Sequence, residues 1–395
     1  MAEPLSIVMD LGFNADFKRG IDYYVDNVVE GLADVDDRNQ YLLFSYFLRD
    51  HARLEARLPH PQRPNFKRLY RRFSQAAVRL LDFKYGLPIV EKGLLRGQKF
   101  SIYHVPAGGL LPHVGSAKTI VTFFDLAVEA FPAQGMADPG RTINDPYTYE
   151  YAKRADCLVA TGECTKKDLM RYYAIPEEKI EVIPTGVNLK IFHEVVDPAA
   201  RQRVRARYGL PPKFLMVIGP DVPPRRTNAE VTLRAYAELH RAGLTDGCQL
   251  AFVGARNDHL ERLLKLAGEL GVGQQSMATG YVALEDLAVV YSLATAVVHP
   301  TTIEGFGYGF EVLACGTPFI TSNLPGVLES VGGVALTVAP SDEESLRRAL
   351  LDVISKPELR RELRQKGLAR AALYDYRKIA QRFMALYEKL ARGGR

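Results

Sequence analysis

Two glutamates flank a glycine-rich turn in the segment TTIEGFGYGFEVLACGTP, residues 301–318. Glycine lets the backbone approach a ligand closely, and the N-terminus of a following helix offers free N–H groups to an anion. Glu304 and Glu311 could therefore accept hydrogen bonds from different hydroxyl groups of one ligand, such as a sugar and a ribose. The alternative from these residues alone is a tight strand-to-helix turn with two solvated acids.

Other patterns that carry chemistry do not stand out in the sequence. There is no clear HxxH, HExxH, DxD or EF-hand pattern, so we expect no metal. A P-loop is lacking, and residues 305–309 do not have the GxGxxG spacing after a first strand, which disfavours an NTPase and a dehydrogenase. The four cysteines are scattered without a CxxC pair, which indicates neither a disulfide framework nor a zinc site and favours a cytoplasmic protein.

The composition is that of an ordinary globular protein. The 395 residues are 47% hydrophobic and 25% charged, which excludes a disordered chain and a collagen-like chain. The longest apolar run, Tyr41–Leu48, is too short to span a membrane, and the N-terminus lacks the features of a secretory signal.

Short apolar runs alternate with segments of helical length in the first half of the chain. The runs mostly lack polar alternation, which is typical of strands buried on both faces of a parallel sheet. The strands expected here are 6–9, 41–47, 101–104, 119–124, 157–160 and 180–184, and the helices are 23–32, 144–155 and 166–173.

The same alternation restarts after residue 212. We expect strands at 214–218, 249–253, 276–279, 295–299, 318–321 and 334–338, and helices at 229–242, 259–270, 285–293, 310–314 and 342–355. Ser341 is the expected N-cap of the last helix. Residues 185–212, which contain prolines, are interpreted as a linker. This order predicts an α/β protein of two Rossmann-like, doubly wound parallel-sheet domains, which would form a cleft if they face each other.

Basic residues concentrate in one segment. Residues 1–48 carry 3 basic and 9 acidic side chains, whereas residues 49–99 carry 13 basic and 4 acidic ones. Between residues 66 and 73, apolar side chains recur at spacings of three and four with basic residues between them, which predicts an amphipathic helix. Its basic side is either solvated or rests on an anionic membrane surface or an anionic acceptor.

Several motifs resemble, in order along the chain, those of the retaining GT-B glycosyltransferases of family 4. The donor-site signature of that family is similar to EGFG at 304–307, Glu311, and ACGTP at 314–318. Further matching segments are GI at 20–21, RAD at 154–156, TKKDL at 165–169, IPTGVN at 183–188, GYV at 280–282 and EDL at 285–287. The resemblance implies an N-terminal acceptor-binding domain over 1–195, a nucleotide-sugar-binding domain over 205–375, and a C-terminal helix, 376–395, that crosses back to the first domain.

The resemblance also assigns roles to the residues of the glycine-rich turn. It implies that Glu304 contacts the transferred sugar and that Glu311 accepts hydrogen bonds from the ribose. The backbone N–H groups around Gly305, Phe306 and Gly307 would hold sugar hydroxyls or the diphosphate.

Further donor-side roles follow from the resemblance. Val282 would lie against the base, Gly219 would leave room for phosphate, and Gly20 belongs to the matching N-terminal loop. Negative charge builds on the leaving diphosphate as the glycosidic bond breaks. Arg226, ahead of Arg225, would neutralise it, and the alternative for such a pair is an ordinary surface position.

The sequence departs from the family pattern in three places. Six residues separate the two glutamates, where the family has seven. Phe124 stands where the family has His, which leaves Asp125 as the polar group for catalysis or acceptor binding, and Thr227 stands where the family has Lys. His104 either contacts the acceptor or packs and hydrogen bonds inside its domain.

The activity implied by the resemblance is a retaining, metal-independent transfer of a hexose, mannose or glucose, from a GDP- or UDP-sugar. The acceptor would be a saccharide or lipid-linked hydroxyl in cell-envelope glycan synthesis. We expect no cofactor, no nucleic-acid partner, and a cytoplasmic location with peripheral membrane association through residues 49–99. The alternatives are a catalytically impaired GT-B-like protein that binds nucleotide sugar or acts as a scaffold, and a sugar-nucleotide-processing enzyme such as an epimerase.

Overall fold

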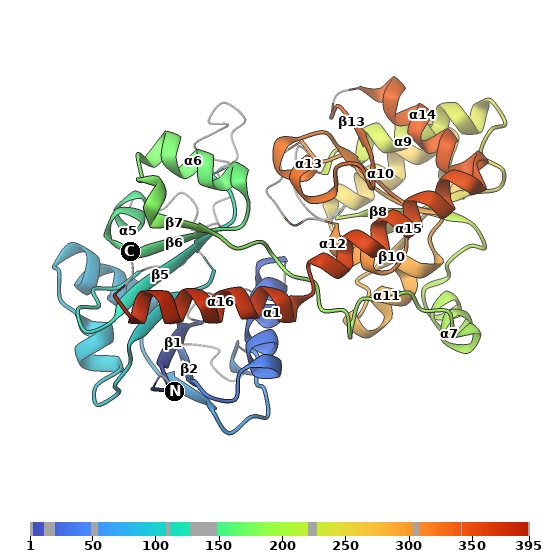
Figure 1. Cartoon of the computed structure of the whole chain (residues 1–395). Helices are drawn as coiled ribbons and strands as arrows, with labels where there is room; N and C mark the ends of the chain where they lie inside the picture. The colour runs from blue at the N-terminus through green and yellow to red at the C-terminus, as the bar shows by residue number, and fades with distance from the viewer. Residues whose placement is uncertain are drawn as a thin grey trace. The chain divides into compact units, whose positions relative to one another are not determined.

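The chain folds into two compact units, each built on a parallel β-sheet (Figure 1). The computed structural model describes residues 3–11, 20–48, 54–107, 111–126, 148–219, 227–302, 307, 309–340 and 342–393, apart from the side chain of Phe83. Unit 1 consists of Met1–Gly186 and Tyr376–Arg395, and unit 2 consists of Val187–Asp375. The chain therefore changes unit at residues 186–187, a few residues before the boundary expected from sequence, and returns at residues 375–376.

Unit 1 contains a seven-stranded sheet in the order β3-β2-β1-β4-β5-β6-β7, with every neighbouring pair parallel. Its buried apolar strands require helices on both faces because a parallel sheet exposes neither face to water. The strands are β1 (Ser6–Asp10), β2 (Gln40–Tyr46), β3 (Phe66–Arg71), β4 (Ile102–Val105), β5 (Lys118–Phe123), β6 (Cys157–Ala160) and β7 (Ile180–Val182).

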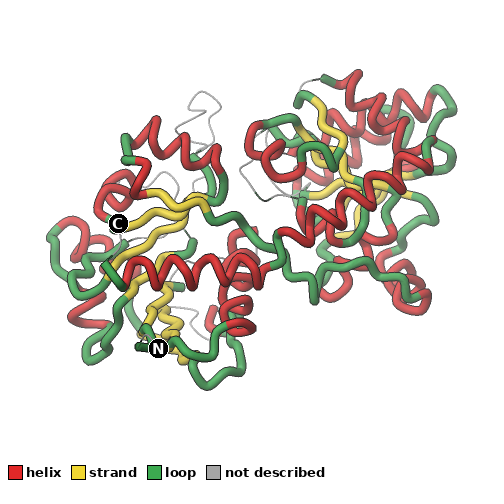
Figure 2. The backbone as a smooth tube through the Cα atoms, viewed as in Figure 1, coloured by secondary structure: helices red, strands yellow, loops and turns green. Residues whose placement is uncertain are grey.

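Two helices from opposite ends of the chain cover one face of this sheet. They are α1 (Gly20–Val35) and α16 (Tyr376–Ala391), which pack against each other and share one apolar core with β1, β2, β4, β5 and β6 (Figures 1 and 2). The other face is covered by α3 (Gln75–Val78), the π-helical segments η1 (Arg79–Lys84) and η2 (Ile89–Leu94), α5 (Thr148–Arg154) and α6 (Glu163–Tyr173). The 3-10 turn η5 (Glu177–Lys179) leads into β7.

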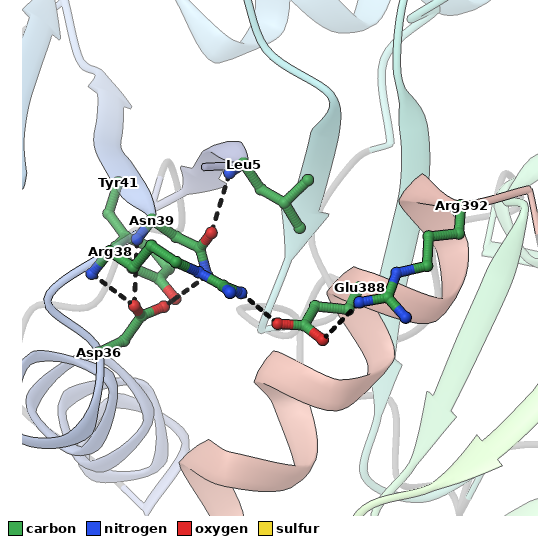
Figure 3. A network of polar contacts seen from close by, with 7 residues as sticks. All are labelled: Leu5, Asp36, Arg38, Asn39, Tyr41, Glu388 and Arg392. Carbon is green, nitrogen blue, oxygen red and sulfur yellow. Dashed lines mark hydrogen bonds and ion pairs between the residues drawn. The ribbon is translucent and has the colours of Figure 1, made fainter. Parts of the chain in front are cut away.

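A polar network joins α16 to the chain between α1 and β2 (Figure 3). The Asp36 carboxylate accepts hydrogen bonds from the N–H of Arg38 at 2.9 Å, both nitrogens of Asn39 at 3.1 and 2.7 Å, and the Tyr41 hydroxyl at 2.7 Å. The Arg38 guanidinium in turn forms an ion pair with Glu388 of α16. The C-terminal helix is therefore held in unit 1 by polar contacts as well as by its apolar face.

Unit 2 contains a six-stranded parallel sheet in the order β10-β9-β8-β11-β12-β13. One face packs on α9 (Ala229–Arg241), α10 (Asp258–Glu269) and α14 (Glu343–Ser355), and the other packs on α7 (Pro198–Tyr208), α11 (Leu284–Leu293), α12 (Phe310–Ala314), α13 (Pro325–Val331) and α15 (Pro357–Leu373). The strands are β8 (Phe214–Ile218), β9 (Gln249–Val253), β10 (Ser276–Gly280), β11 (Ala296–His299), β12 (Phe319–Ser322) and β13 (Leu336–Val338), and the 3-10 turn η6 (Gly273–Gln275) precedes β10.

These two sheets confirm the expected α/β class, but the amphipathic helix expected between residues 66 and 73 is wrong. Residues Phe66–Arg71 form β3, the edge strand that pairs in parallel with β2. The ring of Phe66 stacks on that of Tyr41 with centroids 4.4 Å apart. The free edge of β2 thus supplies hydrogen-bond partners that outweigh the local helical spacing, since long-range pairing overrides a weak periodicity.

Two smaller expectations also need correction. The proposed linker 185–212 contains α7, which begins after Asp197, whose carboxylate accepts hydrogen bonds from the N–H groups of Ala199 and Ala200. The cap seen on α14 is Asp342, which accepts from the N–H of Ser345 at 2.9 Å, whereas Ser341 lies outside the described residues. Among the described residues, no helix combines the length and apolar character needed to cross a membrane.

Candidate functional site

The carboxyl edge of the unit 2 sheet has a topological switch point between β8 and β11. The chain leaves β8 toward β9 on one side, while β11 lies on the other side. Ligands of doubly wound sheets bind at such a point because the loops diverge there. Gly219 follows β8 with φ +67°, and its N–H donates to the carbonyl of Val253 at 3.3 Å. The glycine expected to leave room for phosphate therefore lies at the switch point.

Glu311 lies in the first turn of α12, a short helix of the segment that follows β11. Its side chain is partly buried, and burial raises the pKa of its carboxyl group. Gly309 precedes the helix with φ +100°, and a Cβ at that position would lie 2.5 Å from the Phe319 ring. Only glycine fits this turn, so the glycine-rich sequence is what allows the helix to begin where Glu311 is placed.

The turn before α12 is attached to α13. The backbone N–H of Gly307 donates to the Ser330 hydroxyl at 2.7 Å, and that hydroxyl donates to the carbonyl of Gly326 at 2.9 Å. The Arg370 guanidinium of α15 donates to the carbonyls of Glu329 and Ser330 at 2.6 and 2.9 Å. Neither Ser330 nor Arg370 is part of a local sequence pattern around the glycine-rich turn, so the sequence did not indicate them.

Val282 follows β10 at the same edge of the sheet. The strand ends at Gly280 with φ +72°, after which Tyr281 is 62% exposed and Val282 is buried. Val282 belongs to the same apolar core as Phe310 of α12. The residue expected beside the base is therefore anchored in the core that supports Glu311.

Several predicted residues lie outside the described residues. They are Arg225, Arg226, Glu304, Gly305 and Phe306. Thr227, which directly follows this arginine pair, is buried, and its hydroxyl has no hydrogen-bond partner among the described residues. The described residues also contain no group of three or more His, Cys, Asp or Glu side chains that could hold a metal ion.

The acceptor-side candidates lie in unit 1. Asp125 follows β5 and is partly buried, and its charge contributes to a raised pKa of Asp168 on α6, after the larger effect of burial. Two carboxylates therefore lie within electrostatic reach of each other at the carboxyl end of β5. Gly20, a donor-side candidate that also lies in unit 1, begins α1 and is exposed, with open space where a Cβ would be.

His104 lies in the interior of unit 1 and not on a surface where a ligand could reach it. Its side chain on β4 is fully buried, with Nδ1 2.8 Å from the Tyr387 hydroxyl and Nε2 3.1 Å from the Thr122 hydroxyl. Burial lowers the pKa of His104 to about 3. Because both ring nitrogens are engaged inside unit 1, these contacts fit the packing alternative and not contact with an acceptor.

Asp10 is a polar residue of this region that sequence analysis missed. It ends β1 next to the switch point between β1 and β4, it is buried, and the Tyr103 hydroxyl donates to its carboxylate. The signal was available in the sequence SIVMD, where an acid closes an otherwise apolar strand.

Two family models match the chain in these same regions. The model described as glycosyltransferase family 4 matches residues 18–191, and the model described as glycosyl transferases group 1 matches residues 201–370. The chain belongs to the family 4 glycosyltransferases. The motif around Glu311, Val282 and Gly219 lies within the second match.

Curated relatives of this family 4 chain are named as enzymes that transfer sugars. D-inositol 3-phosphate glycosyltransferase 1 of Catenulispora acidiphila is 30% identical over 250 residues, which is 61% of this chain and 59% of the relative. The serotype-specific mannosyltransferase WbdA of Escherichia coli is 26% identical over 67% of this chain and 32% of its own length. The O-antigen chain mannosyltransferase B of Escherichia coli is 24% identical over 93% of this chain and 88% of the relative. The chain thus spans less than two thirds of the length of the first two relatives.

Solved structures show that this family 4 chain has the GT-B fold. Sucrose-phosphate synthase of Thermosynechococcus elongatus matches with a TM-score of 0.75 and 23% identity, over 99% of this chain and 100% of that chain. Anabaena HepE, solved in complex with UDP-glucose, matches with a TM-score of 0.72 and 14% identity, over 98% of this chain and 100% of that chain. The GT-B fold expected from sequence is therefore confirmed.

Proposed function

We propose that the protein is a retaining hexosyltransferase that uses a nucleoside diphosphate sugar, mannose or glucose, as its donor. The observation that carries the proposal is the position of Glu311, in the first turn of α12 beside the switch point of the unit 2 sheet. The names of two relatives support mannose as the transferred sugar, because WbdA and the O-antigen chain enzyme are named mannosyltransferases. Glucose is supported by HepE, which was solved with UDP-glucose.

The proposed reaction is a same-face displacement at the anomeric carbon of the donor sugar. The bond from this carbon to the diphosphate oxygen breaks, and a bond to the acceptor oxygen forms on the same face. The leaving phosphate oxygen takes the acceptor proton, while Arg226, Arg225 and backbone N–H groups stabilise its charge. Glu304 holds the transferred sugar and Glu311 holds the ribose. No step requires a metal ion or a further cofactor.

We assign the donor to unit 2 and the acceptor to unit 1. The carboxylates of Asp125 and Asp168 suit an acceptor rich in hydroxyl groups, because charged oxygens form strong hydrogen bonds with hydroxyl donors. The acceptor class we favour is a saccharide or lipid-linked saccharide of the cell envelope, and the name of the O-antigen chain mannosyltransferase supports this choice.

Peripheral membrane association is also part of the proposal. Because residues 66–71 form β3 and not the expected amphipathic helix, we place the contact on a different surface of unit 1. In and just after η1, Leu80 is 48% exposed, Tyr85 60% and Leu87 48%, and Lys84 lies close by. Exposed apolar side chains beside basic ones suit the boundary of an anionic bilayer. Sedimentation with anionic vesicles should fall for Leu80→Ser with Leu87→Ser and stay unchanged for the control Leu244→Ser in unit 2. If the wild-type protein binds neutral vesicles as well as anionic ones, membrane association through this basic surface is contradicted.

A panel of GDP- and UDP-hexoses with envelope glycan acceptors tests the proposed function. Transfer with retention of the anomeric configuration supports it. The second candidate is a nucleotide-sugar-binding protein without transfer. It is favoured by Phe124, which replaces a polar residue and packs edge-on against Tyr24 with centroids 4.8 Å apart. Nucleotide binding without turnover on any acceptor would favour that candidate.

A further inference from the structure

Unit 2 has a cavity at the edge of its sheet opposite Glu311 and Gly219. This cavity of about 350 Å³ is lined by Lys213, Cys248, Thr295 and Pro318. Each of these residues directly precedes the first residue of a strand. The strands are β8, β9, β11 and β12, which are adjacent in the sheet. The cavity, which we term the amino-edge pocket, therefore lies at the amino ends of the strands. Its volume falls within the range of about 300–1,000 Å³ typical of small-molecule sites.

Charged residues of α15 form the opposite wall. Arg360, Arg361 and Arg364 line the pocket together with Lys213, and Asp246 is the acidic residue of its lining. The Arg364 guanidinium is paired with the Glu194 carboxylate, so the excess of positive charge rests on Arg360, Lys213 and Arg361. Such an excess attracts anions and raises their local concentration. None of these residues belongs to the proposed donor motif.

Arg360 is the fixed cation of the pocket. Its Nη1 donates to the carbonyls of Val353 and Ile354 at 2.6 and 2.9 Å, at the end of α14. Among the described residues, no carboxylate forms an ion pair with Arg360, and its remaining N–H groups have no hydrogen-bond partner. The planar guanidinium is thus held in place with donors to spare, which is the geometry that suits a phosphate group.

Lys213 and Arg361 have exchangeable partners, unlike Arg364, which both oxygens of Glu194 engage. Lys213 pairs with Asp246 at 2.7 Å, and Arg361 pairs with Glu358 at 3.0 Å, with all four side chains more than half exposed. Exposed pairs of this kind contribute little to stability, because water and salt screen the two charges. Lys213 and Arg361 can therefore each turn toward an anion with more charge than a single carboxylate. Asp246 is the group that an entering anion must displace or avoid.

We propose that the amino-edge pocket binds the phosphate group of a small phosphorylated molecule, with Arg360 as the fixed contact. Lys213 and Arg361 add charge from exposed positions, and Arg364 closes the wall against Gly316, where a Cβ would lie 3.3 Å from its side chain. The pocket lies at the edge of the sheet opposite Glu311 and Gly219, so its occupation does not require an occupied donor site, although Gly316 and Pro318 of the ACGTP segment line it.

Calorimetric titration of the full chain with inorganic phosphate and with glucose 6-phosphate tests this site. Saturating UDP and GDP are present so that the donor site is filled, and ionic strength is matched with chloride. We expect saturable binding of phosphate, glucose 6-phosphate or both, and none of glucose. Binding of glucose 6-phosphate alone assigns an added role to the sugar, and binding of both shows that phosphate suffices. Heat that does not saturate, or equal heat with glucose, would overturn the proposal.

Variants separate the pocket from general surface charge. Arg360→Gln should weaken phosphate binding about tenfold or more, and Asp246→Asn should strengthen it, because a competing carboxylate is lost. Arg256→Gln is the matched control, since Arg256 pairs with Glu261 at 3.1 Å outside the pocket. Loss of the carbonyl contacts could unfold the Arg360 variant, so Lys213→Gln and Arg361→Gln, at exposed positions, are measured as well. Unchanged affinity in the folded variants would refute the site.

Discussion

The Nδ1 atom of His104 lies 2.8 Å from the hydroxyl oxygen of Tyr387. The first residue is on β4 in the middle of the unit 1 sheet, and the second is on α16, almost at the end of the chain. Both side chains are fully buried. The C-terminal helix is therefore part of the core of unit 1, and the histidine serves the fold and not the acceptor.

The burial of His104 makes unit 1 sensitive to mild acid. Burial lowers the pKa of His104 to about 3, below its usual value, so protons bind the unfolded state more readily than the folded state. Stability from the neutral imidazole is present above the unfolded pKa of about 6.5 and is lost as the pH falls below it. Between pH 7.5 and 5.5 this loss amounts to about 1.4 kcal/mol.

The comparison with His104→Gln isolates this effect. Urea unfolding followed by circular dichroism should show the wild type more stable than the variant at pH 7.5. At pH 5.5 the gap should narrow by about 1.4 kcal/mol, because the variant cannot titrate. A gap that stays constant between the two pH values would mean that His104 binds protons equally well in the folded and unfolded states, so that burial does not lower its pKa.

The Asp36 network should contribute measurably to the attachment of α16. Burial raises the pKa of Asp36, but the hydrogen bonds from Tyr41, Asn39 and Arg38 together outweigh burial and hold it below its usual value. Its stabilisation is therefore present at neutral pH and is lost as the pH falls through the acidic range. Asp36→Asn should lower the free energy of unfolding by roughly 1–3 kcal/mol at pH 7.

The neighbouring acid provides the control for this network. Asp37 is exposed, so Asp37→Asn should change the free energy of unfolding by less than about 0.5 kcal/mol. Hydrogen exchange of the α16 amides should quicken in the Asp36 variant alone. Equal effects of the two substitutions would show that the network does not hold the helix.

Gly309 offers a test of the turn that positions α12. A Cβ in Gly309→Ala would meet the Phe319 ring at 2.5 Å, and the backbone is already at φ +100°. Gly271→Ala is the matched control, since its φ is +79° and nothing lies within 4 Å of its Cβ. The control should lose about 1 kcal/mol from backbone strain alone. Scanning calorimetry should show a clearly lower Tm for Gly309→Ala, and equal Tm values would remove the steric argument.

Much of the fold could be predicted from sequence because buried parallel strands are almost purely apolar. The runs FLMVI and QLAFV, for example, are found as β8 and β9 with the expected bounds. The strand β3 could not be found this way, because FKRLYR is polar and lies at an edge, where pairing with β2 decides its structure. Likewise α7 is predominantly polar, and its packing against α11 is invisible to a search for apolar periodicity.

The candidate site was predictable where it depends on one continuous motif. Glu311, Gly307 and Val282 belong to local sequence patterns, and the structure places them at the carboxyl edge of the unit 2 sheet. Ser330 was missed because its contact with Gly307 joins residues 23 positions apart in the chain. The burial of His104 depends on Tyr387, which is 283 residues away, and no local pattern reports such a distance.

The most direct test of the central claim is the affinity of Glu311→Gln for nucleoside diphosphates. Loss of hydrogen bonds from ribose hydroxyls to a charged acceptor should weaken GDP or UDP binding about 10- to 100-fold in calorimetric titration. Glu285→Gln, at an exposed position on α11, serves as the control and should bind as the wild type does. If Glu311→Gln binds nucleotide as tightly as this control, Glu311 does not hold the ribose, and the donor site assigned to unit 2 is contradicted.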